Sequence, residues 1–168
     1  IDVTKGFLYA WGGGLFMGGA KVFDLKKDPY NPVYVGKYDQ LGYIHDGFVD
    51  NDTMYSGHIG AGLFAMVNMA NKSAPELLAT QGTPGAFTHN TWPSDDRRTL
   101  FTTDEVNGSF LSAFDISDPT DIKLLDKIQS NPGSNSIVHN TYVLRNWAVT
   151  SWYKDGLTIV DATRPDNL

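Results

Sequence analysis

The chain of 168 residues contains no cysteine. This absence excludes disulfide bonds, thiolate catalysis and metal sites built on cysteine ligands. It fits a cytosolic protein, and it fits equally well an exported protein that is stabilised by the packing of its sheets.

Long apolar runs and clusters of basic residues are also missing. No apolar stretch approaches the roughly 20 residues that span a bilayer, and no charged segment followed by an apolar one marks a signal peptide. The formal net charge is −6, and no Lys/Arg cluster supplies the basic face that phosphate binding needs. We therefore expect no transmembrane segment in this chain and no nucleic-acid partner.

Two common catalytic and nucleotide-binding motifs are absent. The glycine-rich stretch "AWGGGLFMGGA" is followed neither by Lys-Ser/Thr nor by a helical pattern, so it predicts a hairpin tip and not a phosphate-binding loop. No Gly-x-Ser-x-Gly elbow is present.

What the chain does contain is typical of short strands and turns. Glycine occurs 17 times and aromatic residues make up 12% of the sequence. Alternating segments such as "LTIVD" have the period of a β-strand. The length fits a single domain, and the fold class predicted is all-β.

Three of the four histidines stand at the head of similar stretches, "YIHDGF", "FTHNTW" and "IVHNTY". A second recurring feature is a short apolar strand that ends in an acid or its amide and is soon followed by proline. Those strand-end residues are Asp24, Asn68, Asp115 and Asp161, at steps of 44, 47 and 46 residues. Two independent landmarks with one period indicate an internal repeat, with units at about 1–42, 43–85, 86–135 and 136–168.

A period of roughly 40–50 residues with about four β-like segments per unit predicts a β-propeller of four-stranded antiparallel blades. About four blades are covered. Because the alignment places the chain's start just after a repeat's histidine, we expect the sequence to be a fragment and these blades to be part of a larger propeller.

The segments "GLTIVDATRPDN" and "LSAFDISDPTDIKLLDKI" resemble LVIVD repeats, and "FTHNTWPSDDRRTLFTTDE" with "IVHNTYVLRNWAVTSWYKDGLTIVD" resembles the choice-of-anchor B family of bacterial surface proteins. The resemblance implies an exported propeller, extracellular or on the outer cell surface of a bacterium, with an anchoring segment elsewhere. One departure is Asn68, which stands where the repeats carry aspartate; we expect it to weaken the bond made there.

If each histidine opens the first strand of its blade, the three imidazoles form a ring facing the central channel. Imidazoles with nearby carboxylates are competent ligands for zinc, iron or manganese, and carboxylates also suit calcium. The candidate ligands for such a divalent metal are His45, His89, His139, Asp46, Asp104 and Glu105. The alternative is that each histidine and its Asx neighbour only satisfy backbone groups, because a structural device recurs in every blade whereas a catalytic site is usually asymmetric.

The acidic pair Asp104 and Glu105 occurs in no other repeat. Adjacent residues on a strand point to opposite faces, so we expect only one of the two to face the channel. The strand-end acids are expected to accept backbone N–H bonds in the following turn. The fourth histidine, His58, is expected in a loop.

The favoured hypothesis is a non-catalytic binding or scaffold module. Its partners would be cell-surface proteins or glycans, in a larger assembly, and it would hold a metal in its channel. The alternative is a metal-dependent, lactonase-like propeller hydrolase, which needs a general base near the metal. A glycan-binding propeller is the third hypothesis, and it requires two or more Trp or Tyr rings in one solvent-facing groove.

Overall fold

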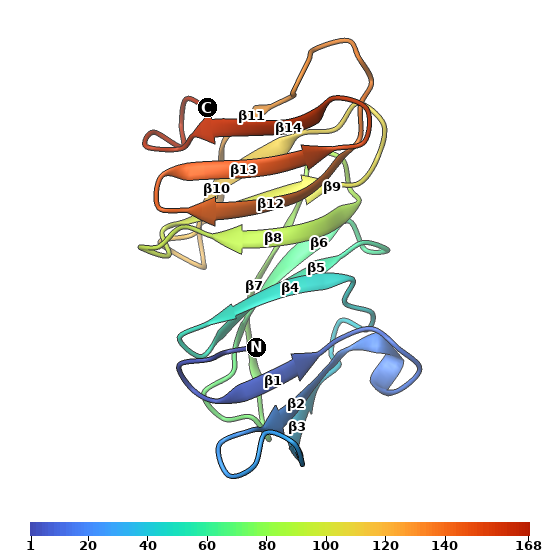
Figure 1. Cartoon of the computed structure of the whole chain (residues 1–168), viewed down its shortest axis with the longest axis vertical. Helices are drawn as coiled ribbons and strands as arrows, with labels where there is room; N and C mark the ends of the chain where they lie inside the picture. Colours follow the sequence, from blue (N-terminus) through green and yellow to red (C-terminus); the bar gives the residue numbers. More distant parts are fainter.

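The computed structural model describes residues 1–168 and contains fourteen strands in four antiparallel sheets (Figure 1). The only helical element is one 3₁₀ turn, η1 (Phe16–Gly18), in the glycine-rich connection between the first two strands. The predicted all-β class is confirmed.

Each sheet is formed by consecutive strands, and we call the four sheets blades 1 to 4. Blade 1 contains β1 (Phe7–Ala10), β2 (Ala20–Asp24) and β3 (Val33–Tyr38). Blade 2 contains β4 (Asp46–Asp50), β5 (Thr53–His58), β6 (Leu63–Asn68) and β7 (Glu76–Gly82). Blade 3 contains β8 (Thr88–Pro93), β9 (Thr99–Asp104), β10 (Leu111–Asp115) and β11 (Lys123–Ile128). Blade 4 contains β12 (Val138–Leu144), β13 (Trp147–Trp152) and β14 (Gly156–Asp161). That these blades form one domain stays a prediction.

The strand-end residues make the same bond in all four blades. The side-chain oxygen of Asp24 accepts the backbone N–H of Lys26 at 2.8 Å. The equivalent bonds measure 2.9 Å at Asn68, Asp115 and Asp161, each to the backbone N–H two residues further on. The predicted turn bond is confirmed, and Asn68 accepts it with its amide oxygen at the same distance as Asp115 and Asp161. That the bond is weaker at Asn68 stays a prediction.

The core lies between the blades. Each of blades 1 to 3 turns one face, which we call its leading face, toward the next blade, and the central side chains of that face are at most 5% exposed. The leading faces comprise Tyr9, Ala20 and Val22 in blade 1, Tyr55, Phe64 and Met66 in blade 2, and Phe101, Leu111 and Ala113 in blade 3. The opposite, trailing face of the following blade covers them, for example with Met54 and Val67 or with Leu100 and Phe114.

The strands that open blades 2, 3 and 4 are neighbours. β8 contacts β4 on one side and β12 on the other, and the three strands run side by side through the middle of the molecule (Figure 1). The first residues of these strands are therefore brought together. No helix in the structure is long and apolar enough to cross a membrane.

Candidate functional site

Three histidine rings form a row at the start of β4, β8 and β12. The ring centroids of His45 and His89 are 4.4 Å apart, and those of His89 and His139 are also 4.4 Å apart. His45 directly precedes β4, where its N–H donates to the Gly57 carbonyl at 2.9 Å. The pairing of β8 with β9 and of β12 with β13 is irregular at the other two histidines. Such bulges redirect side chains.

Glu105 brings a carboxylate to this row. It directly follows β9, and its Oε2 lies 3.5 Å from His89 Nε2 while its Oε1 lies 3.7 Å from His139 Nε2. The Tyr153 hydroxyl donates a hydrogen bond to Glu105 Oε1. One carboxylate is thus held between two imidazoles and a phenol.

Ligand atoms of His45, His89 and Glu105 all lie within 4.8 Å of one another. Tetrahedral zinc with bonds near 2.1 Å needs its ligand atoms about 3.4 Å apart, so modest side-chain rotations would close this triad on an ion. His89 is 5% exposed, and its Nδ1 is buried without a hydrogen-bond partner. A buried ring nitrogen without a partner is unusual in a folded protein.

The row is electrostatically asymmetric. Burial lowers the pKa of His89 below its ordinary value, and the neighbouring His45 and His139 act in the same direction, whereas the Glu105 carboxylate opposes them. His89 is therefore favoured in the neutral form that binds metals. The hydrogen bond to Glu105 raises the pKa of Tyr153, which keeps that phenol protonated as a donor.

Asp104 serves a different part of the molecule. It is fully buried, and its carboxylate accepts bonds from the Thr83 hydroxyl at 2.5 Å and from the N–H groups of Gly85 and Phe87 at 2.8 and 3.0 Å. An added Cβ at Gly85 would lie 2.6 Å from Asp104 Cβ, so the turn closes tightly on this side chain. The Asp104 carboxylate, at the end of β9, thus binds the turn before β8, and it is not one of the ligand groups that lie within 4.8 Å of one another.

Asp46 and Asn90, which follow the first two histidines of the row, link neighbouring blades. Asn90 Nδ2 donates to Asp46 Oδ2 at 2.8 Å, and Asn90 Oδ1 accepts the Thr141 N–H at 3.0 Å. The histidines therefore lie in the row, whereas the side chains of Asp46 and Asn90 bond across the blades, and Asn140 Oδ1 is buried without a partner.

Two groups near the row were not found from the sequence. Tyr43 lies with its hydroxyl 3.2 Å from His45 Nδ1, and Tyr153 binds Glu105 as described. Tyr153 follows β13 where Glu105 follows β9, 48 residues earlier, so alignment of the repeats could have paired these two positions.

The expectation that His58 lies in a loop is wrong. His58 is the last residue of β5 and is 1% exposed. Its Nδ1 lies 3.0 Å from the Tyr43 carbonyl and its Nε2 lies 3.0 Å from the Ser56 hydroxyl, so both nitrogens have partners. Burial lowers the pKa of this ring. It is a satisfied core histidine and not a member of the row.

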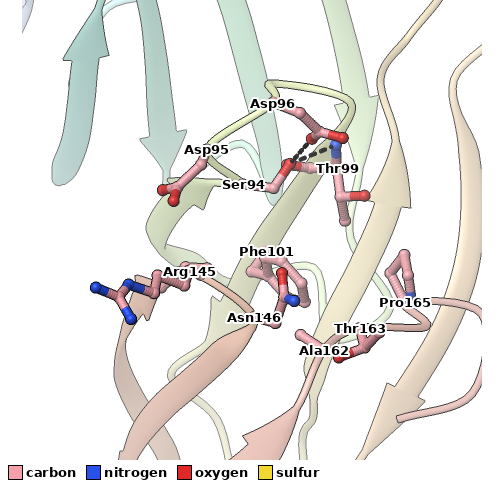
Figure 2. A pocket seen from close by; sticks show the side chains of 11 residues that line it. Ser94, Asp95, Asp96, Thr99, Phe101, Arg145, Asn146, Ala162, Thr163 and Pro165 are labelled. Carbon is pink, nitrogen blue, oxygen red and sulfur yellow. Dashed lines mark hydrogen bonds between the residues drawn. The ribbon is translucent and has the colours of Figure 1, made fainter.

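A polar pocket lies at the far ends of β8 and β12 from the histidines (Figure 2). At its edge, the Ser94 hydroxyl donates to Asp96 at 2.7 Å and accepts the Thr99 N–H at 3.0 Å. These bonds hold the turn between β8 and β9, and the hydrogen bonds from the Ser94 hydroxyl and the Arg98 N–H lower the pKa of Asp96. The edge of the pocket is therefore turn structure, and the polar side chains of Asp95, Arg145 and Asn146 also line it.

No pocket contains the aromatic groove that glycan binding requires. Trp92 packs between Phe48 and Tyr142, with ring centroids 4.5 and 4.8 Å away, and Trp152 is buried. The one pocket with a tryptophan is lined by Leu144, Trp147, Val149 and Ile159 and has a single aromatic ring.

No family model matches the chain, and no curated protein matches it either. Solved structures do. The crystal structure of a putative 6-phosphogluconolactonase from Bacteroides uniformis matches with a TM-score of 0.78 and 8% identity, over 100% of this chain and 50% of that one. The periplasmic gluconolactonase of Pseudomonas aeruginosa matches with a TM-score of 0.66 and 13% identity, over 95% of this chain and 54% of that one.

The β-propeller domain of a Myceliophteria thermophila protein matches with a TM-score of 0.65 and 12% identity, over 94% of this chain and 56% of that domain. The chain has the β-propeller fold. At these identities the likeness establishes the fold alone. The chain spans about half the length of the structures it matches.

Proposed function

We propose that this chain is part of a surface-exposed bacterial propeller of the LVIVD type. It acts as a non-catalytic binding module and holds a divalent metal at His45, His89 and Glu105. The surface location rests on the resemblance of the repeats to choice-of-anchor B proteins. The metal rests on the geometry of the histidine row.

The observation that carries the metal proposal is the approach of ligand atoms of His45, His89 and Glu105 to within 4.8 Å of one another. The His89 nitrogen that faces Glu105 is Nε2, at 3.5 Å. His58, the buried histidine outside the row, has both nitrogens hydrogen-bonded to protein groups, whereas His89 is buried with its Nδ1 unpartnered. The hydrogen bonds of the protein therefore do not account for the position of the His89 ring as they do for His58.

The donor set favours a transition metal. Two imidazoles and one carboxylate suit zinc, iron or manganese, whereas calcium takes six to eight oxygen ligands. The two other acids near these strands are occupied, since Asp104 accepts three bonds and Asp46 binds Asn90 and its own neighbour Gly47. We therefore favour zinc over calcium.

Three protein ligands leave a coordination position open for a partner's side chain. The side chain of His139 is 36% exposed and Tyr153 is 59% exposed, so both flank the triad from the solvent side. A histidine or carboxylate of a cell-surface protein could complete the coordination there. This gives the module a specific mode of attachment.

A metal-dependent hydrolase is the second candidate. The observation that favours it is the asymmetry of Glu105, the one acid at this position among the blades, held by Tyr153. Two of the matched structures are described as lactonases. In such an enzyme the metal would polarise a carbonyl, and a base near it would activate water.

Elemental analysis of the purified protein, before and after chelation, tests the proposal. We expect about one zinc, iron or manganese per chain, lost in His89→Ala and Glu105→Gln and retained in the control His58→Gln. A metal-free wild-type protein that also fails to take up zinc would overturn the proposal. Hydrolysis of lactones by the metal-loaded protein, absent after Glu105→Gln, would favour the enzyme instead. Protease treatment of intact cells tests the surface location.

A further inference from the structure

The two oxygens of the Glu105 carboxylate lie in different surroundings. Oε2 lies 3.5 Å from Nε2 of His89, the histidine with which Glu105 would share a metal. Oε1 accepts the Tyr153 hydroxyl, whereas His139 Nε2 is 3.7 Å from it, which is too long for a hydrogen bond. Tyr153 therefore occupies one oxygen of the carboxylate and leaves the other oxygen free.

The position of Tyr153 is fixed by its backbone and by the His139 ring. Tyr153 directly follows β13, and its N–H donates to the Ile137 carbonyl at 2.9 Å. The ring centroids of Tyr153 and His139 are 5.5 Å apart. Because Tyr153 is 59% exposed, its hydroxyl is not needed to complete the core, and its one side-chain hydrogen bond is the bond to Glu105.

We infer that Tyr153 determines the metal specificity of the histidine row by restricting Glu105 to one ligand oxygen, which favours four-coordinate zinc over six-coordinate manganese. The inference rests on the proposed metal site at His45, His89 and Glu105. A carboxylate can chelate an ion only if both of its oxygens turn toward that ion. A phenol that holds Oε1 opposes this rotation, as groups hydrogen-bonded to metal ligands commonly do.

The number of ligands distinguishes the two metals. Zinc needs four, and His45, His89 and one oxygen of Glu105 with one further ligand provide them. Manganese prefers octahedral coordination rich in oxygen, so it gains more from a second Glu105 oxygen. Zinc also binds more tightly than manganese at most sites of any geometry. The informative quantity is therefore the change in the preference for zinc when the Tyr153 hydroxyl is removed.

Tyr43 offers a matched comparison at the other end of the site. Its hydroxyl lies 3.2 Å from His45 Nδ1, and the residue is 47% exposed. This contact leaves His45 Nε2 as the free ring nitrogen and orients the ring for any cation. Loss of the Tyr43 hydroxyl should therefore weaken the binding of zinc and of manganese alike.

Calorimetric zinc titration, without manganese and in a fixed excess of manganese, tests the inference. In Tyr153→Phe we expect zinc affinity to fall at least about tenfold. We also expect excess manganese to lower the apparent zinc affinity at least about tenfold more in this variant than in the wild type. Tyr43→Phe should bind zinc more weakly but respond to manganese as the wild type does. Tyr30→Phe, at a residue that is 92% exposed, is the control and should change neither quantity.

The possible failures are distinguishable. An equal effect of manganese on the wild type and on Tyr153→Phe would overturn the inference and leave the metal site standing. An effect of the same size in Tyr43→Phe would overturn it too, because the effect would not depend on Glu105 Oε1. Complete loss of zinc binding in folded Tyr153→Phe would show that the tyrosine is required for any metal, and would also overturn it. A wild-type protein that takes up no zinc would overturn both the metal site and the inference.

Discussion

Asp104 and Glu105 are adjacent in the chain, yet their carboxylates serve different parts of the molecule. Asp104 is fully buried and accepts three hydrogen bonds from the turn before β8. Glu105 lies 3.5 Å from His89 and accepts the Tyr153 hydroxyl. Alternation at the end of a strand thus separates a structural acid from a candidate ligand.

Replacement of Asp104 tests whether its carboxylate stabilises the turn before β8. Asp104→Asn turns a donor toward N–H groups that need an acceptor, so we expect a loss of about 1–3 kcal/mol in the free energy of unfolding. Urea unfolding measures it, with the exposed Asp95→Asn as control. Loss of the bound metal with unchanged stability would contradict this assignment.

Replacement of Glu105 tests whether its carboxylate is a metal ligand. Glu105→Gln removes the charge that a cation needs, and we expect zinc affinity to fall at least about tenfold. The free energy of unfolding of the metal-free protein should change by less than about 0.5 kcal/mol, since the side chain is partly exposed. Calorimetric zinc titration makes the comparison, with Glu76→Gln as control. Equal affinities would remove Glu105 from the site.

The bond between Asn90 and Asp46 predicts a pH-dependent mutational effect. Asn90→Asp places two carboxylates at a contact that now measures 2.8 Å, so we expect a loss of about 1–3 kcal/mol at pH 7. The loss should shrink at pH 4, where one of the two carboxylates can take up a proton. Urea unfolding at both pH values, with the exposed Asn107→Asp as control, checks this. An equal loss at both pH values would contradict it.

The hydrogen bond that Asp115 accepts at the end of β10 predicts that the free energy of unfolding depends on pH. The Ser117 N–H, with the Ser117 hydroxyl, lowers the pKa of Asp115 below 3.8. A lowered folded-state pKa contributes stability above pH 3.8, and this contribution is lost as the pH falls through the folded-state value. Asp115→Asn should keep the bond, as Asn68 does, and flatten this acid loss.

Asp115→Ala is the comparison for that prediction. It removes the acceptor, and we expect it to cost about 0.5–1.5 kcal/mol at pH 7. Unfolding by urea between pH 2 and 7 measures both variants. If the asparagine variant is as unstable as the alanine variant at pH 7, Asp115 does not stabilise the protein through its hydrogen bond to the backbone.

The blades were predictable because their landmarks are local. A strand that ends in Asp or Asn before a turn makes its bond two residues away, so the pattern is written in short segments such as Asp115 to Ser117. The period of those segments then indicated four blades, and the structure contains four sheets. Asn68 makes this bond at the same distance as the aspartates, and the weaker bond expected there stays a prediction.

The site was only partly predictable because its contacts cross between blades. The row of His45, His89 and His139 followed from the repeat, but the choice between Asp104 and Glu105 depends on where β9 ends. The bond between Asp46 and Asn90 joins residues 44 positions apart in sequence. His58 was predicted in a loop because polar residues and glycines surround it in the sequence, but it is the last residue of β5.

Anomalous diffraction at the zinc edge, from crystals of the protein purified without chelator and supplied with zinc, locates the bound metal. We expect one anomalous peak about 2.0–2.2 Å from a nitrogen of His45, a nitrogen of His89 and an oxygen of Glu105. The peak should be absent from His89→Ala crystals. Zinc bound elsewhere, or an empty row with Glu105 still bound to Tyr153, would exclude the proposed metal site.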